Sequence, residues 1–297
     1  MSDFVQQQNS ICDFATSDSW VILSPIEQSI KKKIEAVGTP LKDWDTNIYR
    51  GVLTGCNEAF IIDSEKREEI LANCQTEDER QRTAELIRPI LRGRDIKRYG
   101  YVDNGLYLIN THNGVRGRIP RIKIEDYPAV KAHLDQFWDR IATRADKGDT
   151  PYNLRNCAYL EDFSRPKIIW KRIGSILRFS FDNKGCLGLD STCFAAGEHI
   201  EYLCCVLNSL MGHYLLKDSP KTGTGDLLVS VQAIEPACIP YNALYEKQLL
   251  ALLERQIANP SATTEKEIDD IVFTMYGLSP IECDYVTRYI KLSQQSL

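Results

Sequence analysis

The sequence has 297 residues, of which 43% are hydrophobic and 26% are charged, and its 36 Lys and Arg residues against 41 Asp and Glu residues give a formal net charge of −5. This composition is typical of a globular protein with a sizeable core. No run of about 18 apolar residues is present, and residues 1–14 lack a basic segment followed by an apolar one. We therefore predict neither a membrane span nor a signal peptide, and we expect a cytoplasmic protein.

Caps, breakers and apolar spacing predict the elements of the first half of the chain. Ser24 is a suitable N-cap because Pro25 and Glu27 follow it, and Gly38 is a suitable helix end. The predicted order is a polar linker or tail over 1–20, a helix over 24–38, a hairpin over 47–63, a helical segment over 64–91 broken by Pro89 and Gly93, β-rich hairpins over 92–123, and a helix over 128–144.

The second half begins with short β segments and ends with helices. The predicted order is β segments over 166–195, an apolar helix over 200–216, an exposed Gly/Thr loop over 220–226, a strand over 229–241, and helices over 245–259, 264–276 and 280–292. Leu249, Leu252, Leu253 and Ile257 fall on one side of their helix, and we expect that side to pack on the body. The pattern predicts an α+β fold, with a mixed body over 21–240 that contains β hairpins and flanking helices, and a helical C-terminal section over 241–297 packed on it.

A basic island lies between Arg80 and Lys123, where 11 Lys and Arg residues face 3 acids, while the other 253 residues sum to 25 − 38 = −13. Glycine and tyrosine interleave with these cations, so the island is predicted to be a series of turns and short strands. A strong local positive field inside an acidic protein suits a polyanion such as a nucleic-acid backbone. The alternative is a solvated basic face with no ligand.

Reading DNA requires cations on phosphates and Arg, Asn, Gln, Thr or Tyr side chains at base edges. Both kinds gather in four segments, RGRDIKRYGY, THNGVRGRIPRIK, SRPKIIWKRIGSILR and DSPKTGTGD. The candidate DNA-binding residues are Arg92, Arg94, Lys97, Arg98, Arg116, Arg118, Arg121, Lys123, Lys167, Lys171, Arg172, Lys221 and Thr222. The alternative for the two lysines of PKIIWKRI is an edge strand guarded against aggregation.

The motifs of DNA-modifying catalysis are missing from the sequence. A methyltransferase needs a Gly-rich turn for its cofactor and an Asn/Asp-Pro-Pro-aromatic segment, and Asp149-Thr150-Pro151-Tyr152 lacks the second proline. There is no phosphate-binding loop, no G-x-S-x-G, and no Cys or His spacing that suits zinc. We therefore predict no catalytic residue, metal or cofactor in this chain, and a protein that reads DNA.

Several landmarks occur together in order along the chain. They are GVLTGCNEAFIID at 51–63, ELIRPILRGRDIKRY at 85–99, YLINTHN at 107–113, EDYPAVKAHLDQFWDRIATRADKG at 125–148, EDFSRPKIIWKRI at 161–173, EYLCCVLNSLMGHYLL at 201–216, IEPACIPY at 234–241 and EIDDIVFTMYGLSPIE at 267–282. Over about residues 20–290 the sequence resembles the TaqI-like C-terminal specificity domain of adenine-specific DNA methyltransferases and type II, chiefly type IIG, restriction-modification enzymes.

The resemblance implies a target recognition domain that binds double-stranded DNA and reads a short sequence. It implies a partner methyltransferase domain or subunit, which would transfer a methyl group from S-adenosylmethionine to a flipped adenine. It also implies that Thr54, Gly55 and Asn57 form a structural turn and that RGRDIKRY lies near the DNA, with a buried Arg94–Asp95 pair as the alternative. The rival hypotheses are a protein-interaction module that docks a partner through the C-terminal helices, and a nuclease whose motif is not recognised.

Overall fold

The structure is a computed structural model that describes residues 23–295. Its fold is α+β, as the sequence predicts. The helices are α2 (Pro25–Val37), α3 (Asn57–Phe60), α4 (Ser64–Ala72), α5 (Glu77–Leu86), α6 (Pro128–Asp135), α7 (Trp138–Thr143), α8 (Ile200–Asn208), α9 (Leu210–Leu215), α10 (Val231–Ile234), α11 (Ala243–Ala258), α12 (Ala262–Met275) and α13 (Pro280–Gln295), with short 3₁₀ helices η1 (Leu41–Asp43), η2 (Ile124–Asp126) and η3 (Glu161–Ser164).

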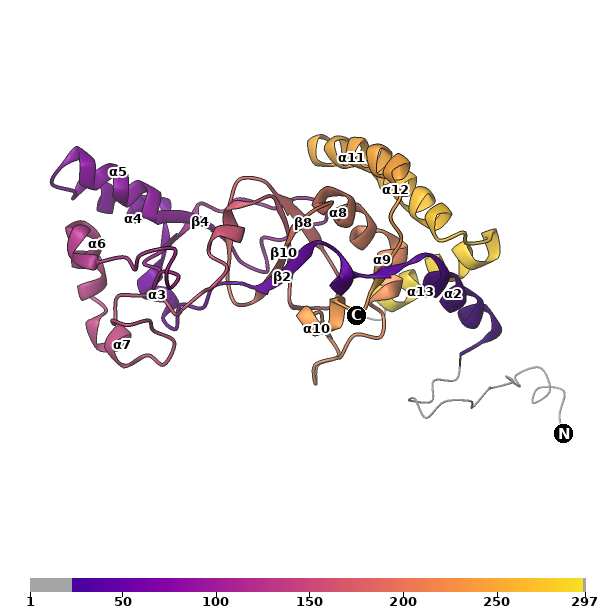
Figure 1. The fold of residues 1–297 in the computed structure, drawn as a ribbon, viewed down its shortest axis with the longest axis horizontal. Helices are drawn as coiled ribbons and strands as arrows, with labels where there is room; N and C mark the ends of the chain where they lie inside the picture. Colours follow the sequence, from indigo (N-terminus) through magenta and orange to yellow (C-terminus); the bar gives the residue numbers. More distant parts are fainter. Residues whose placement is uncertain (1–22, 296–297) are drawn as a thin grey trace.

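The strands are short and lie in four sheets. They are β1 (Thr39–Pro40), β2 (Thr46–Arg50), β3 (Ile61–Asp63), β4 (Ile87–Leu91), β5 (Leu106–Ile109), β6 (Lys167–Lys171), β7 (Ile173–Gly174), β8 (Phe179–Asp182), β9 (Leu187–Gly188), β10 (Thr192–Gly197), β11 (Leu227–Leu228) and β12 (Cys238–Ile239). Figure 1 shows an elongated molecule, with α3 to α7 at one end, α2 and α11 to α13 at the other, and β2, β8 and β10 between them. Among residues 23–295, no helix is long and apolar enough to cross a lipid bilayer.

Helix α2 begins and ends where its caps predict. The Ser24 side chain accepts a hydrogen bond from the Glu27 amide and the Glu27 carboxylate accepts one from the Ser24 amide, so both partners of a capping box are present. Gly38 ends the helix. Ile30 is buried, whereas Val37 at the end of the same face is 45% exposed.

The central sheet has the strand order β2-β10-β6-β8, and all its pairs are antiparallel. One face contributes Ile168, Trp170 and Ala195 to the core that includes α8 and α11 to α13. The opposite face contributes Ile169 and Phe194 to a second core, which includes α3 to α6. Both faces are therefore buried, and this explains why the PKIIWKRI segment lacks a polar face.

The predicted hairpin over 47–63 is wrong, because β2 and β3 belong to different sheets. Strand β2 pairs with β10, whereas β3 pairs with β5 in the sheet β3-β5-β4-β9. The connecting chain turns at Gly55, whose φ of 65° favours glycine, and then forms helix α3 from Asn57. The buried Arg144 guanidinium donates to the Thr54 carbonyl, so the turn is held from a distant loop.

Other boundaries also differ from the prediction, since distant partners decide them. Residues 87–91 are the last part of the segment predicted to be helical. They form strand β4 instead, because they pair with β5 and β9. The predicted helices over 128–144 and 200–216 are each two helices. In the second case Ser209 interrupts the helix and accepts a hydrogen bond from the Gly212 amide, so it caps α9. Within the predicted strand over 229–241, Val231–Ile234 is helix α10 and only β12 is extended.

The C-terminal helices pack on α8 and α9 through apolar side chains. Leu249, Leu252 and Leu253 are buried in the first core, as their spacing predicts. Ile257 is 46% exposed, so its predicted burial is wrong. In the last turn of α11 the buried side chain is that of Gln256, which donates to Glu265 on α12.

Candidate nucleic-acid interface

Strand pairing brings several positive charges to one end of the central sheet. Strands β2 and β6 both run antiparallel to β10, so their last residues, Arg50 and Lys171, lie at the same end. Strand β4 ends beside them, because it runs parallel to β9 and the Leu91 carbonyl accepts a hydrogen bond from the Leu189 amide. The chain that follows β4 therefore carries Arg94 to this end of the sheet.

Close contacts confirm that these chain segments touch. A Cβ atom on Gly93 would lie 2.8 Å from Lys171 Cγ, so only glycine lets the segment after β4 approach so closely. The Arg172 amide donates to the Ser191 carbonyl, and a guanidinium nitrogen of Arg50 lies 3.8 Å from a carboxylate oxygen of Asp190. Arg178, directly before β8, belongs to the same end.

We call Arg50, Arg94, Lys171, Arg172 and Arg178 the sheet-end cluster. Among the described residues, Arg50 has one long ion pair and the other four have none. The Nε groups of Arg50 and Arg172 are buried and have no hydrogen-bond partner among residues 23–295. Burial raises the pKa of the Cys193 thiol between them to about 11, although both guanidinium groups oppose that rise.

The opposite end of the sheet carries the opposite charge. Asp43 and Asp45 precede β2, Glu198 follows β10, and all three are exposed. The His199 ring binds the Glu246 carboxylate at 2.6 Å near the same end. The sheet therefore has one acidic and one basic end, and a polyanion would approach the basic one.

One predicted DNA contact is wrong because its side chain is fully buried, and a second candidate side chain has a partner inside the fold. Lys167 is fully buried, donates to the Phe163 carbonyl at 2.7 Å, and forms an ion pair with Asp182. Arg92 binds the buried Asp95 carboxylate through two nitrogens, at 3.0 and 3.1 Å. The predicted alternative of an Arg94–Asp95 pair is therefore wrong as well, because Arg92 is the partner.

Arg98 connects the basic island to the C-terminal helices. Its guanidinium lies 2.8 Å from the Glu265 carboxylate on α12 and donates to the Asn208 carbonyl at 2.7 Å. These two partners hold the side chain against α8 and α12. The prediction that Arg98 binds DNA is not supported by this geometry, whereas Lys97 is exposed.

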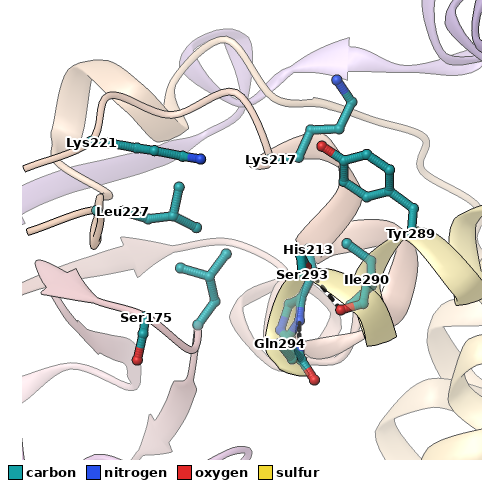
Figure 2. A pocket seen from close by; sticks show the side chains of 11 residues that line it. Ser175, His213, Lys217, Lys221, Leu227, Tyr289, Ile290, Ser293 and Gln294 are labelled. Carbon is teal, nitrogen blue, oxygen red and sulfur yellow. Dashed lines mark hydrogen bonds between the residues drawn. The ribbon is translucent and has the colours of Figure 1, made fainter. Parts of the chain in front are cut away.

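Lys221 and Thr222 lie in the predicted exposed loop, which adjoins the sheet-end cluster. Strands β7 and β11 pair directly after Arg172, and the Arg172 carbonyl accepts a hydrogen bond from the Val229 amide. The Lys221 side chain is exposed and extends over a pocket (Figure 2). Lys221 therefore adds one exposed cation beyond the sheet, and Asp226 in the same loop balances its charge.

Arg116, Arg118, Arg121 and Lys123 lie in a separate loop nearer α6 and α7, and all four are exposed. The backbone forms a tight hairpin between Val115 and Ile119, with Arg116 and Arg118 at its tip. Arg118 forms an ion pair with Glu161. Arg116 and Lys123 have no ion pair among residues 23–295, so these two remain available to a ligand.

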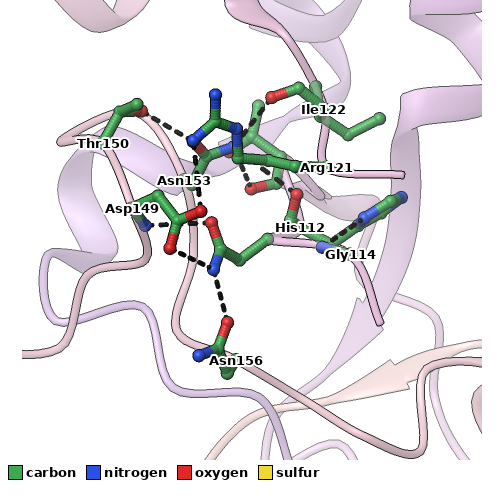
Figure 3. A network of polar contacts seen from close by, with 10 residues as sticks. His112, Gly114, Arg121, Ile122, Asp149, Thr150, Asn153 and Asn156 are labelled. Atoms are coloured by element: carbon green, nitrogen blue, oxygen red, sulfur yellow. Dashed lines mark hydrogen bonds and ion pairs between the residues drawn. The ribbon is translucent and has the colours of Figure 1, made fainter. Parts of the chain in front are cut away.

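A polar network holds the base of this hairpin (Figure 3). Asp149 accepts from Asn113 at 3.0 Å and from Arg121 at 3.2 Å, and its amide donates to the Asn113 side chain. Asn153 donates to the Ile122 carbonyl at 2.9 Å. Burial lowers the pKa of His112, whose Nδ1 accepts from the Gly114 amide. The network orders the hairpin before any ligand is bound.

Arg50 was not predicted from the sequence, and Arg178 ends the predicted segment SRPKIIWKRIGSILR but was not among the candidate residues. Both lie outside the basic island, and Arg50 stands alone among polar and apolar neighbours. One feature of the sequence could have indicated Arg50, namely its position at the end of a predicted strand. The segment NIYR ends in an arginine directly before Gly51, and KIIWKR ends in two cations shortly before Gly174. Only strand pairing shows that these ends coincide.

Solved structures with a similar fold include parts of restriction-modification enzymes. The structure is similar to part of the type IIL restriction-modification enzyme MmeI, which was solved in complex with DNA, with a TM-score of 0.60 and 11% identity over 88% of this chain and 37% of that one. The type IIG restriction endonuclease BpuSI matches with a TM-score of 0.45 and 14% identity over 86% of this chain and 34% of that one. This chain thus spans little more than a third of either enzyme. No protein-family model and no curated protein matches the sequence.

Proposed function

We propose that this chain is a sequence-specific recognition domain for double-stranded DNA in a restriction-modification enzyme, of the TaqI-like kind that the sequence resembles. In this proposal residues 21–240 form the recognition domain and residues 241–297 are a helical section packed on it. Methyl transfer from S-adenosylmethionine belongs to a methyltransferase domain or subunit that partners this chain, and no residue described here carries that chemistry.

The observation that supports the proposal most is the sheet-end cluster. Five cations from four chain segments lie at one end of the sheet, and among residues 23–295 only Asp190 faces them as an ion-pair partner. Guanidinium and ammonium groups of this kind bind phosphates and set the register of a protein on a duplex. The fold is also similar to part of MmeI, an enzyme solved in complex with DNA.

Base reading is assigned to the hairpin at Val115–Ile119. Its base is ordered by Asp149 and Asn113, while Arg116 at its tip has no ion pair among the described residues. An arginine on an ordered loop can bind the O6 and N7 atoms of guanine through two nitrogens. The alternative of a protein-interaction module that docks a partner through the C-terminal helices has less support. Leu249 and Leu253 of these helices are buried inside the protein, so they are not available to a partner.

The test is a titration of duplex DNA at several salt concentrations, followed by fluorescence anisotropy. Lys171→Ala and Arg94→Ala remove phosphate contacts, so each should weaken binding to all sequences alike and lower the slope of log K against log salt by about 1. Arg116→Ala should cost about 1 to 3 kcal/mol and relax the preference at one base position.

Lys42→Ala is the matched control. Lys42 is exposed, has no ion pair among residues 23–295, and lies just before β2 at the acidic end of the sheet. It should leave both affinity and salt slope unchanged. Equal effects of Lys42→Ala and Lys171→Ala would contradict the proposal, as would a wild-type salt slope in both sheet-end variants.

A further inference from the structure

A pocket of about 240 Å³ lies between the sheet-end loops and the C-terminal helices (Figure 2). Its walls come from four parts of the chain. The pocket is lined by Leu177 between β7 and β8, Lys221 on the loop that leads into β11, Leu227 in β11, His213 on α9, and Ile290 and Gln294 on α13. DNA recognition as proposed above does not use this pocket.

His213 is the polar group that a ligand would satisfy. The residue is 6% exposed and lines the pocket, yet its Nε2 atom has no hydrogen-bond partner among the described residues. Its Nδ1 atom lies 3.4 Å from the Gln294 amide nitrogen, which leaves Nε2 as the N–H donor. Burial, assisted by the charge of Arg98, lowers the pKa of His213 to about 3, so the ring is neutral at pH 7. Buried donors without partners are uncommon.

The remaining lining separates into apolar and positive parts. Leu177 and Ile290 are buried apolar side chains, and Leu227 points toward the same space (Figure 2). Lys221 is exposed and has no ion pair among residues 23–295. Lys217 is less available, because it forms an ion pair with Asp218 and lies over the Tyr214 and Tyr289 rings. The pocket therefore has an apolar wall, a hydrogen-bonding end and, within the described part of the chain, a lysine without an ion pair.

This combination fits a heteroaromatic ring with a polar edge and an attached anion. A planar base can lie on aliphatic side chains while its ring nitrogens and exocyclic oxygens accept hydrogen bonds. The volume is below the range of about 300 to 1,000 Å³ typical of larger ligands, so a single base fits while its phosphate stays outside. A bare inorganic anion would leave the apolar wall without a function.

We propose that this pocket binds one nucleotide, with its base against Leu177, Leu227 and Ile290, its polar edge at His213 and its phosphate at Lys221. The nucleotide is either free in solution or a unit of a DNA strand turned out of its stack. Binding of a free nucleotide does not depend on the proposed function. Binding of a nucleotide from a DNA strand does rest on the proposed function.

Calorimetry on the full chain with dAMP, dGMP, dCMP, dTMP and inorganic phosphate tests the pocket. At least one nucleotide should bind, and Lys221→Ala and His213→Phe should each weaken it about tenfold, the change that 1.4 kcal/mol produces. His213→Phe keeps a planar ring at this position, at a slightly larger volume, and removes the unpartnered N–H, so the melting temperature of the unliganded protein should not fall. If inorganic phosphate binds as tightly as every nucleotide, the base contributes nothing to affinity, and its proposed place in the pocket is overturned.

A substitution that fills the pocket distinguishes the two sources. Leu227→Trp should abolish nucleotide binding, whereas Leu244→Trp, at a side chain 66% exposed on α11, should not. A duplex that carries 2-aminopurine should brighten on binding to the wild type and not to Leu227→Trp if the nucleotide comes from DNA. Brightening without calorimetric binding of free nucleotides supports the DNA source. The absence of both signals, in protein that still binds duplex DNA through Lys171, would overturn the pocket and leave the proposed function standing.

Discussion

At the scale of single residues, the same side chain type serves two opposite purposes within one strand. Lys167 and Lys171 begin and end β6, yet the first is fully buried and the second is exposed. Burial lowers the pKa of Lys167, and the Asp182 carboxylate opposes that shift. Asp182 also accepts hydrogen bonds from Tyr101 and from the Cys186 amide, so the pair joins three chain segments.

Lys167→Met should destabilise the protein by about 3 to 5 kcal/mol, because it leaves the Asp182 charge buried without its partner. Urea unfolding at pH 7 measures this change. Lys171→Ala on the same strand is the control and should stay within about 0.5 kcal/mol of wild type. Adding Asp182→Asn to Lys167→Met should recover part of the loss, since a neutral amide still accepts hydrogen bonds. Equal stability of Lys167→Met and wild type would show that the pair is not buried.

At the scale of elements, helices distant in the sequence are joined by polar contacts as well as by apolar faces. Helix α2 meets α13 through Glu282, whose carboxylate accepts from Ser29 at 2.7 Å and from Lys33 at 2.6 Å. It also accepts from the Ser279 amide just before α13. Burial alone would raise the pKa of Glu282, but these donors lower it from an ordinary value of 4.5 to about 2.

The folded-state pKa of Glu282 lies below its unfolded value, so its stabilising effect is complete above about pH 4.5 and is lost as the pH falls toward 2. We expect Glu282→Gln to be less stable than wild type at pH 7, and this difference to shrink as the pH falls from 4.5 to 3. Urea midpoints measured across that range give the result. Glu254→Gln, at an exposed position of α11, should show no such convergence. A difference between Glu282→Gln and wild type that does not change with pH would contradict the linkage.

At the scale of the whole molecule, one sheet belongs to two cores. Neighbouring residues of β10 point to opposite faces, so Ala195 packs in the first core and Phe194 in the second. The centroid of the Phe194 ring lies 4.4 Å from that of Phe163 and 5.3 Å from that of Tyr49. A strand that is part of both cores couples their unfolding.

Phe194→Ala should therefore weaken both ends of the molecule, although the substituted side chain faces only one. We expect a loss of about 3 to 5 kcal/mol from the cavity. Native-state hydrogen exchange should show equal loss of protection in β5 of the second core and in α8 of the first. Leu244→Ala, at an exposed site, should leave both unchanged. Loss of protection confined to β5 would mean that the two cores unfold independently.

The sequence alone determined features that depend on neighbouring residues. Ser24, Glu27 and Gly38 define α2 because a cap is satisfied within one helical turn. The short strands β6, β8 and β10 and the buried side of α11 follow from local apolar patterns. The positive charge of the island is likewise a property of composition, and Arg94, Lys171 and Lys221 are exposed cations in the structure.

Tertiary structure decided which of the predicted cations are available and which lie together. Three of the predicted cations form ion pairs inside the protein: Lys167 with Asp182, Arg92 with Asp95, and Arg98 with Glu265. The pairs of Lys167 and Arg98 join segments that local patterns do not connect. Arg50 meets Lys171 only because β2 and β6 pair with the same strand, β10. The sign of a charge is set by its residue, whereas its burial and its neighbours are set by long-range pairing. For that reason the sequence predicted a positive surface, and the fold decided that it forms at one end of a sheet buried on both faces.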